Sequence, residues 1–437
     1  MKKLIEIFPY FCFFITFLLL AYIFYKSEIY WDGSIRDYYL VYFILIISLL
    51  ILIFSICCSQ YKYKEYFFIL SISVVVGLYI FEGYIVLKRL AYVDQSAKIK
   101  IYESETGKKY DTRSLIKVYK DLKKDDENIT INIASNFNDS NGFLSLSGIS
   151  NTKTIYCNEN GYYSIYESDR YGFNNPDDQW NKNKIEYLLI GDSFTIGACV
   201  NRPNDTSSVL RKLSKRNVIN LAQPSQGPLI EYALLKEYSS AKFKKIIWMY
   251  YEGNDLLNLK DELNNKILKE YIINEDFTQS LKFNQKKIDK IKKETFKKLL
   301  EKLEKTKSKD EKFFSKELTK FIKLDKLREN LFHSVNKPLS EFNNILYLAK
   351  ELANKNNSEL YFVYLPSYDR YRVKFIKSEF KEIKKIVENL NIPFIDIDEK
   401  VFKKEENPLD LFPFRSYGHY NTLGYKKIAL EIYNSTK

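Results

Sequence analysis

Three long apolar stretches dominate the first fifth of the chain. The 19 residues Ile7–Tyr25 and the 24 residues Tyr38–Tyr61 carry no formal charge, and the 22 residues Tyr66–Leu87 carry only Glu82. A helix rises about 1.5 Å per residue, so each stretch can cross a hydrocarbon layer of about 30 Å. The pattern predicts transmembrane helices at about 7–25, 38–61 and 66–87, within a membrane region of residues 1–89. Glu82 lies about one turn from a span end, so we expect its carboxylate to snorkel outward rather than to act inside the membrane.

The positive charges around these spans predict their orientation. Lys2 and Lys3 precede the first span, and Lys62 and Lys64 lie in the loop between the second and third. Cytoplasmic loops carry an excess of Lys and Arg, so both segments are expected in the cytoplasm. A cleaved signal peptide is the alternative for the first span, but no small-x-small cleavage site follows Leu20. We predict a multi-pass protein of a bacterial-type inner membrane with an extracytoplasmic C-terminal domain.

Beyond residue 180, short apolar runs alternate with stretches of helical periodicity. The runs have the length and composition of buried strands. They are Tyr187–Ile190, Val218–Leu221, Lys245–Tyr251, Leu360–Leu365 and Phe394–Ile397. Thr206–Leu213 and Leu229–Tyr238 are the first helices between them. Strands that alternate with helices predict an α/β domain with a parallel sheet and right-handed crossovers.

Two other parts of the chain lack this alternation. Residues 90–180 mix charged runs with turn-rich sequence and predict a linker followed by short strands and loops. Residues 256–340 form a Lys-rich insertion, and Lys260–Lys337 holds 22 Lys and Arg against 14 Asp and Glu. Apolar residues recur there at helical spacing, namely Leu299, Leu300, Leu303, Phe313, Phe314, Leu318, Phe321 and Ile322. We expect the apolar stripe to pack on the parent domain, with a membrane surface or a polyanionic glycan as alternative partners.

Composition excludes several classes of protein. The 437 residues are 46% hydrophobic and 28% charged, with a net charge of +13, which excludes wholesale disorder and collagen-like structure. An outward-facing domain would rarely meet nucleic acid, so none is predicted as a partner. Cys157 and Cys199 are the two cysteines outside the membrane region. A pair in an oxidising compartment predicts a disulfide, with two buried thiols as the alternative.

Candidate chemistry gathers in turns at the expected carboxyl edge of the sheet. Gly191-Asp192-Ser193 follows the first strand, and the segments holding Gly227 and Asn254 follow the second and third. Ligands of open α/β sheets bind at this edge, near helix N-termini. Ser193 is therefore placed as a nucleophile. The N–H groups of Ser193 and Gly227 and the Asn254 amide are candidate donors to an oxyanion. Taken singly, each also fits a helix cap or turn residue.

The chain holds two histidines. His419 lies in a loop before the last helix, and a loop after the fifth strand returns to the same sheet edge, so His419 can take the Ser193 proton as general base. His333 lies in the Lys-rich insertion and is expected at its surface or between helices. These distant histidines and the unclustered cysteines form no metal-ligand set, and phosphate-binding or dinucleotide fingerprints are missing from the sequence. Neither a metal nor a cofactor is predicted.

These blocks, in this order, resemble the SGNH hydrolases, also called the GDSL-like lipase and esterase superfamily. The matching residues are Gly191-Asp192-Ser193, Gly227, Gly253-Asn254-Asp255 and His419, and the resemblance covers residues 181–437. It implies a flavodoxin-like three-layer α/β/α sandwich. It also implies Ser193 as nucleophile, His419 as base, and Ser193, Gly227 and Asn254 as the oxyanion hole.

The chain departs from this family at one position. An aspartate usually stands two or three residues before the histidine, whereas Tyr417 and Ser416 occupy those positions here. Either a Ser-His dyad operates, or Asp410 or Asp398 reaches His419 from elsewhere. The departure also leaves open slow catalysis or a catalytically silent descendant.

The resulting functional prediction is a membrane-anchored extracytoplasmic serine esterase that deacetylates a cell-envelope carbohydrate. One alternative is an O-acyltransferase that modifies a surface glycan with acyl groups from a separate membrane protein. The other is a non-catalytic glycan-binding or assembly protein, which the missing aspartate favours. Arg170, Asn174 and Asn175 are candidates for the substrate cleft, with a packed loop as the alternative.

Overall fold

The computed structural model describes residues 1–30, 32–33, 36–90, 95–134, 142–305, 318–325, 327, 337–372 and 379–437. The chain divides into two compact units. The first comprises Met1–Val86 and Leu318–Leu327, and the second comprises Leu87–Glu317 and Arg328–Lys437. Part of the Lys-rich insertion therefore belongs to the membrane unit, which the sequence pattern did not predict.

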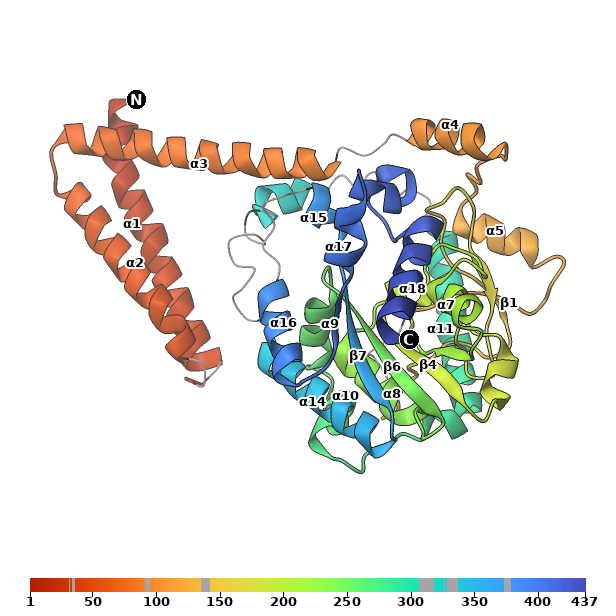
Figure 1. The fold of residues 1–437 in the computed structure, drawn as a ribbon. Helices are drawn as coiled ribbons and strands as arrows, with labels where there is room; N and C mark the ends of the chain where they lie inside the picture. Colours follow the sequence, from red (N-terminus) through yellow and green to blue (C-terminus); the bar gives the residue numbers. More distant parts are fainter. Residues whose placement is uncertain are drawn as a thin grey trace. The chain divides into compact units, whose positions relative to one another are not determined.

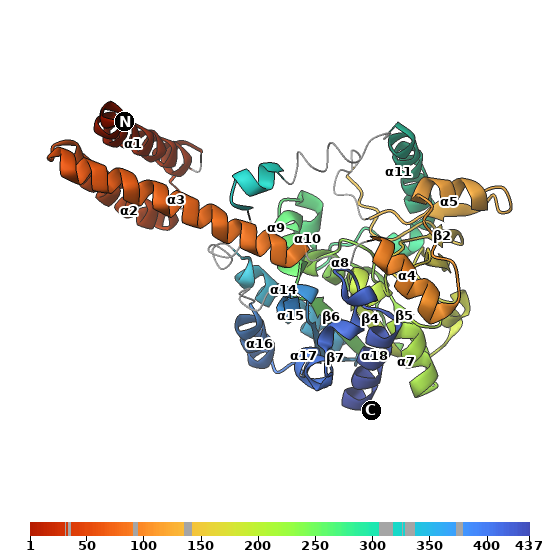
Figure 2. The same ribbon diagram turned by 90° about the horizontal axis from the view of Figure 1, so that it is seen from above.

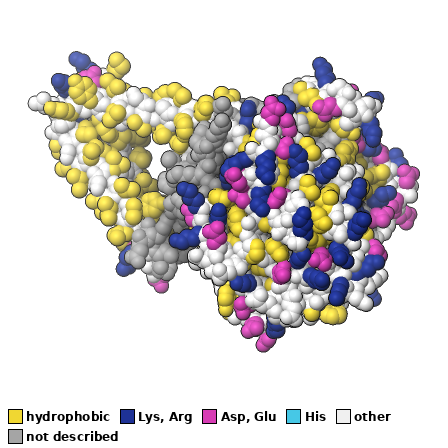
Figure 3. Space-filling model, in the orientation of Figure 1, with side chains coloured by type: hydrophobic (Ala, Val, Ile, Leu, Met, Phe, Trp, Pro, Cys, Tyr) yellow, Lys and Arg dark blue, Asp and Glu magenta, His cyan; other side chains and the backbone are white. Residues whose placement is uncertain are grey.

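Three helices form the bulk of the first unit (Figure 1). They are α1 (Lys2–Phe24, continued by a π-helical turn at Tyr25–Tyr30), α2 (Arg36–Cys57) and α3 (Tyr61–Leu90). Each is long and apolar enough to cross a membrane, and only 11–17% of the most apolar part of each is buried inside the protein. Figure 3 shows hydrophobic side chains along these helices. The three predicted spans therefore correspond to three helices that could cross a membrane.

A five-stranded parallel sheet forms the centre of the second unit. Its strands are β4 (Ile185–Gly191), β5 (Val218–Asn220), β6 (Phe243–Tyr251), β7 (Glu359–Leu365) and β8 (Phe394–Asp396). Their order is β5-β4-β6-β7-β8, and every neighbouring pair is parallel. All five predicted strands are present. The chain order reverses at β4, and such a switch point is where ligands bind in open α/β sheets.

Helices cover both faces of this sheet (Figure 2). Successive strand residues point to opposite faces, so Leu188 and Ile190 pack in one core and Tyr187 and Leu189 in another. The first core includes residues of α8 (Pro228–Tyr238), α14 (Leu339–Lys355) and α16 (Phe380–Asn389). The second includes residues of α7 (Thr206–Ser214), α17 (Ile397–Lys400) and α18 (Thr422–Thr436). The predicted three-layer α/β/α sandwich is confirmed.

Residues 95–181 contain more regular structure than a linker with short strands. Two helices, α4 (Gln95–Thr106) and α5 (Leu115–Leu122), precede the strands β1 (Ile129–Ile131), β2 (Lys153–Ile155) and β3 (Ile165–Glu167). β2 pairs in parallel with β1 and antiparallel with β3, so residues 156–164 form a hairpin loop. A 3-10 turn at Asp177–Asn181 leads into β4. The hairpin loop becomes important at the site described below.

The insertion contributes helices of its own. These are α9 (Asp255–Glu262), α10 (Lys266–Ile273), the 3-10 turn Leu281–Phe283 and α11 (Gln285–Lys305). Leu299, Leu300 and Leu303 of α11 pack against Val118 and Ile129, as expected for a stripe that covers the parent domain. His333, Phe313 and Phe314 lie outside the described residues. The remaining short elements are α6 (Ser193–Ile196), α15 (Tyr368–Arg372), and 3-10 turns at Phe402–Lys404, Pro408–Leu411 and Pro413–Arg415.

Candidate active site

Ser193 stands on a tight turn between a strand and a helix. β4 ends at Gly191, whose φ of 151° and close contact with Thr195 leave no room for a Cβ atom. Asp192 caps α6, because its Oδ1 accepts a hydrogen bond from the N–H of Phe194 at 2.8 Å. Ser193 is the first residue of α6 and is 9% exposed. The turn therefore presents the Ser193 hydroxyl at the switch point of the sheet.

His419 reaches this hydroxyl from the segment before α18. Its Nε2 lies 2.8 Å from Ser193 Oγ. The imidazole packs on the ring of Phe194, with 4.6 Å between ring centroids, and Phe194 stacks in turn on Tyr251 at 3.6 Å. The aromatic rings limit the positions open to the imidazole. His419 is therefore held within hydrogen-bonding reach of the serine, as general-base catalysis requires.

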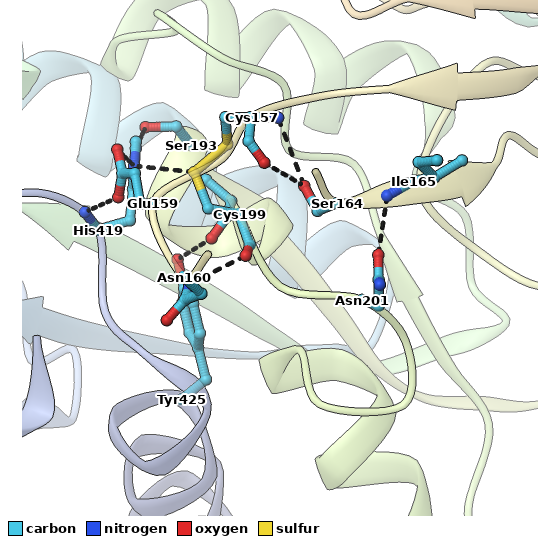
Figure 4. Close-up of a disulfide and its surroundings, with 11 residues drawn as sticks. Cys157, Glu159, Asn160, Ser164, Ile165, Ser193, Cys199, Asn201, His419 and Tyr425 are labelled. Atoms are coloured by element: carbon cyan, nitrogen blue, oxygen red, sulfur yellow. Dashed lines mark hydrogen bonds and ion pairs between the residues drawn. A yellow bond between two sulfur atoms is a disulfide. The ribbon is translucent and has the colours of Figure 1, made fainter. Parts of the chain in front are cut away.

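A third residue, Glu159, completes the arrangement (Figure 4). Its Oε1 lies 3.0 Å from His419 Nδ1, and its Oε2 accepts a hydrogen bond from the His419 backbone N–H at 2.6 Å. Glu159 comes from the hairpin loop between β2 and β3, outside the α/β sandwich. Carboxylate, imidazole and hydroxyl thus form a chain of hydrogen bonds with the geometry of a serine-hydrolase triad.

The electrostatics of the pair suit this arrangement. Burial lowers the pKa of His419, but the hydrogen bond and charge of Glu159, with the charge of Asp192, outweigh it and raise that pKa above its ordinary value. Burial raises the pKa of Glu159, but the hydrogen bond and charge of His419 outweigh it and lower that pKa. An ionised Glu159 therefore favours the imidazolium that forms when His419 takes a proton.

Asp410 and Asp398, the acids proposed from the sequence, have other partners. Asp410 is paired with Arg415, and Asp398 accepts hydrogen bonds from Tyr371 and Arg370. A signal for the true partner lies beside the histidine. Gly418 has no side chain, and a Cβ there would lie 2.6 Å from Glu159 Oε2. The glycine makes room for a carboxylate that arrives from another part of the chain.

A disulfide links the hairpin loop to the segment that follows the nucleophile. Cys157 and Cys199 are joined by an S–S bond, and Asn160 Nδ2 donates to the carbonyl oxygen of Cys199 at 3.0 Å (Figure 4). Asn158 anchors the same loop to the carbonyl oxygen of Asp111 at 2.7 Å. Asn158 and Asn160, the residues directly before and after Glu159, are thus tied to neighbouring segments. The predicted cysteine pair is present and fastens the loop that carries Glu159.

The oxyanion-hole prediction needs correction at Gly227. Its N–H donates to the carboxylate of Glu262 at 2.6 Å, and a Cβ on it would lie 2.7 Å from the Cβ of Asn258. Gly227 therefore permits close packing of α8 on α9, and its N–H is already engaged.

The other two candidate oxyanion donors are the N–H of Ser193 and the side-chain amide of Asn254. The N–H of Ser193 lies at the start of α6, where the helix dipole favours negative charge. Asn254 stands directly before α9. Burial raises the pKa of the Asp192 carboxyl, and the Asn254 side chain opposes this rise, so its amide lies near the residue that precedes the nucleophile. Ser193 and Asn254 therefore remain candidates for the oxyanion hole.

The predicted cleft residues brace the fold instead. Arg170 Nη2 pairs with Asp177 Oδ2 at 2.6 Å. Asn174 and Asn175 are only 3% and 1% exposed, and Asn175 Nδ2 donates to Asp169 Oδ2 at 2.9 Å. Side chains this buried cannot contact a substrate that enters from solvent. The burial of Asn174 and Asn175 favours the packed-loop alternative for these two residues.

Ligand atoms of Glu159, Cys199 and His419 lie within 4.8 Å of one another, a spacing that a metal ion also requires. The Cys199 sulfur is bonded to Cys157, however, and is not a thiolate. His419 Nδ1 and Glu159 Oε1 already contact each other. We assign this cluster to the triad.

A cleft of 830 Å³ lies beside the segments that carry Glu159 and His419. Its walls combine aromatic and polar side chains, including Tyr102, Asn160, Tyr162, Phe412, Phe414 and Arg415. Phe414 is held at a φ of 53°, which bulky residues rarely adopt. Strain of this kind gathers at ligand-binding positions, and the volume is that of a small-molecule site.

Comparisons with known proteins were made for sequence and for fold. No protein-family model matches the sequence, and no curated protein matches it. Solved structures do match. A candidate lipolytic protein of the G-D-S-L family from Desulfitobacterium hafniense is 14% identical, with a TM-score of 0.31, and the match covers 58% of this chain and 99% of that one.

Two further structures match a similar share of the chain. The psychrotrophic esterase EstA from Pseudoalteromonas sp., in a structure inhibited by monoethylphosphonate, is 12% identical with a TM-score of 0.28; 58% of this chain and 96% of EstA are covered. The acetyl xylan esterase AlAXEase is 11% identical with a TM-score of 0.32, and 57% of this chain and 98% of that chain are covered. A large part of this chain has no counterpart in any of the three.

Proposed function

We propose that this protein is a membrane-anchored serine esterase, in which Ser193 forms an acyl-enzyme. The observation that carries the proposal is the hydrogen-bond chain from Ser193 through His419 to Glu159. The α/β domain has the SGNH-type sheet order, and the nucleophile, asparagine and histidine blocks meet at one edge of that sheet. Glu159 removes the main argument for a non-catalytic protein, which was the missing acid.

The proposed reaction begins when Ser193 Oγ attacks the ester carbonyl carbon and His419 Nε2 takes the hydroxyl proton. The negative charge that develops on the carbonyl oxygen is stabilised by the N–H of Ser193 and the Asn254 amide. The ester C–O bond then breaks, and His419 gives its proton to the leaving alcohol oxygen. Water attacks the acyl-serine with His419 as base, which releases the acid and restores the free serine.

The proposed substrate is an acetylated carbohydrate of the cell envelope. The cleft lined by Asn160 and Asn421, near Glu159 and His419 in the chain, offers aromatic rings and hydrogen-bonding groups, a mixture suited to the apolar faces and hydroxyls of sugars. A disulfide is typical of an oxidising compartment, which agrees with an extracytoplasmic domain anchored in a bacterial-type inner membrane. A sugar hydroxyl in place of water would make the same acyl-enzyme an O-acyltransferase. That reaction requires a partner membrane protein to supply the acyl group.

The proposal is tested with a fluorophosphonate probe on the detergent-solubilised full-length protein. We expect an adduct on Ser193, located by peptide mass spectrometry, that is lost in Ser193→Ala and in His419→Ala. Removal of a serine nucleophile costs on the order of 10⁶ in kcat in another serine hydrolase. Ser340→Ala, at an exposed serine of α14, is the matched control and should label normally. Folded protein that forms no adduct on Ser193 would contradict the proposal.

The cleft makes a separate prediction about substrate size. Phe414→Ala is expected to raise KM for an acetylated polysaccharide by about 3- to 10-fold, because the contact of a half-buried aromatic ring with a sugar face contributes roughly 0.5–1.5 kcal/mol. Turnover of p-nitrophenyl acetate, which is too small to fill the cleft, should stay within a factor of two, on the order of experimental scatter. Tyr347→Ala, at a 49% exposed residue of α14, serves as the control. Equal losses on both substrates would assign Phe414 to the fold instead of the cleft.

A further inference from the structure

Segment 318–327 of the Lys-rich insertion, of which the structure describes residues 318–325 and Leu327, packs against the third membrane helix. Residues 318–322 are helical, and the whole segment belongs to the membrane unit (Figure 1, short cyan helix). The hydroxyl of Tyr79 in α3 donates to the carbonyl oxygen of Ile322 at 2.9 Å. The rings of Tyr79 and Phe321 lie 5.7 Å apart, and Phe321 lies 3.8 Å from the position of a Cβ on Gly83. The contacts place the segment along about one turn of α3.

Glu82 lies in the same turn of α3 and does not snorkel outward as expected. Its exposure is 0%, and its Oε2 accepts a hydrogen bond from the backbone N–H of Leu327 at 2.7 Å. A backbone N–H without a partner costs several kcal/mol, on the order of a lost hydrogen bond, in a medium that holds no water. The Glu82 carboxylate therefore accepts the hydrogen bond of the Leu327 N–H, which would otherwise lie without a partner in the apolar layer. This gives the intramembrane acid a structural partner.

The depth of the segment follows from its contacts. The apolar span of α3 ends at Leu87. Tyr79 and Gly83 precede that end by eight and four residues, which corresponds to about 6–12 Å at 1.5 Å per residue. This is the depth at which amphipathic segments lie between lipid headgroups and acyl chains. Side chains on the outer face of the segment must therefore suit lipid.

The outer face of the segment meets this requirement. Leu318 is 46% exposed and Ile322 is 57% exposed, and they are four residues apart, on one side of a helix. Lys323 is exposed next to them and can reach the headgroups. Exposed apolar side chains that continue the surface of a membrane helix are stabilised by acyl chains rather than by water.

We propose that residues 318–327 form an interfacial membrane segment, held on α3 by Glu82 and Tyr79, that inserts Leu318 and Ile322 among the lipid acyl chains. Leu318 and Ile322 contact the acyl chains of the lipid, and Lys323 lies at the headgroups. The second unit is then tied to the membrane twice, through the chain after α3 and through this segment of the insertion. The proposal is independent of the catalytic function.

Photo-crosslinking in the full-length protein tests the segment directly. The photoreactive residue p-benzoylphenylalanine is placed at position 322, and the protein is reconstituted in phosphatidylcholine nanodiscs and irradiated. We expect a lipid adduct by mass spectrometry, as at the lipid-facing control position 80 of α3, where Ile80 is 68% exposed. Position 273, where Ile273 of α10 is 72% exposed in the other unit, should form none. An adduct at position 80 with none at position 322 would overturn the proposal.

The role of Glu82 is tested in the same assay. Glu82→Ala should lower the lipid adduct at position 322 several-fold, because the Leu327 N–H loses its acceptor. Glu82→Gln keeps an acceptor oxygen and should restore the adduct. The adduct at position 80 should not change in either variant, which shows that α3 remains inserted. Equal adducts at position 322 in all three proteins would show that Glu82 does not hold the segment.

Discussion

Replacing Glu159 with glutamine is expected to lower kcat/KM for a small ester by about 10³- to 10⁴-fold, the effect of neutralising the orienting carboxylate in another serine hydrolase. The amide can still contact His419, but it no longer favours the tautomer that accepts the serine proton, nor does it stabilise the imidazolium. Steady-state hydrolysis of p-nitrophenyl acetate measures the loss. Glu167→Gln, at an exposed acid at the end of β3, is the matched control and should retain activity.

The pH profile distinguishes this role from a purely structural one. Activity requires neutral His419, so it is lost as the pH falls through the pKa of this residue. Glu159 raises that pKa above its ordinary value, whereas burial alone would lower it. In Glu159→Gln the acid limb of kcat/KM should therefore move to lower pH while the rate at its plateau drops. A variant with the wild-type rate and an unmoved limb would show that Glu159 does not serve His419.

Loss of the Cys157–Cys199 disulfide is the second change with a large expected effect. The bond closes a loop of 42 residues, which corresponds to about 4 kcal/mol of unfolding free energy in the chain-entropy model. The hairpin loop that carries Glu159 is fastened through this bond. The double variant Cys157→Ser/Cys199→Ser is therefore expected to lose activity to about the level of Glu159→Gln, by about 10³-fold, and to unfold at lower denaturant concentration.

A double-mutant cycle tests whether the disulfide acts through Glu159. If the bond serves to place the carboxylate, its removal from Glu159→Gln should cause little further loss of kcat/KM. Losses that multiply would mean that the bond supports Ser193 or His419 separately. Treatment of the wild-type protein with a phosphine reductant should reproduce the double variant. A variant without Cys12, Cys57 and Cys58 should behave like wild type, since these thiols lie in or at the membrane helices.

Parts of the site that lie within one turn could be predicted from sequence. Gly191-Asp192-Ser193 joins a strand to a helix through local steric and capping requirements, and both leave a signature in neighbouring residues. Asn254 likewise lies in a turn between a strand and a helix, after β6 and directly before α9. The oxyanion-hole role predicted for Gly227 was wrong. A glycine that allows two helices to pack closely cannot be distinguished by sequence from one that offers its N–H to a substrate.

The acid of the triad could not be predicted in this way. Glu159 lies 260 residues before His419 and outside the sheet that carries the other site residues. Its position depends on the β2–β3 hairpin, the disulfide and the space left by Gly418. Of these, only Gly418 lies beside His419 in the sequence, and a glycine there does not indicate which carboxylate occupies the space. The same holds for Glu82, whose partner Leu327 is 245 residues away.

The sequence alone determined the three apolar helices, the five strands and the serine at the carboxyl edge of their sheet. Each of these depends on spans of fewer than about 30 residues, in which hydrophobic period and turn chemistry specify the local structure. Only the tertiary structure decided which carboxylate orients His419, which N–H groups remain available at the oxyanion, and where residues 318–327 lie. These are contacts between distant segments, and their energies depend on how whole elements pack together, which the local pattern of residues does not encode.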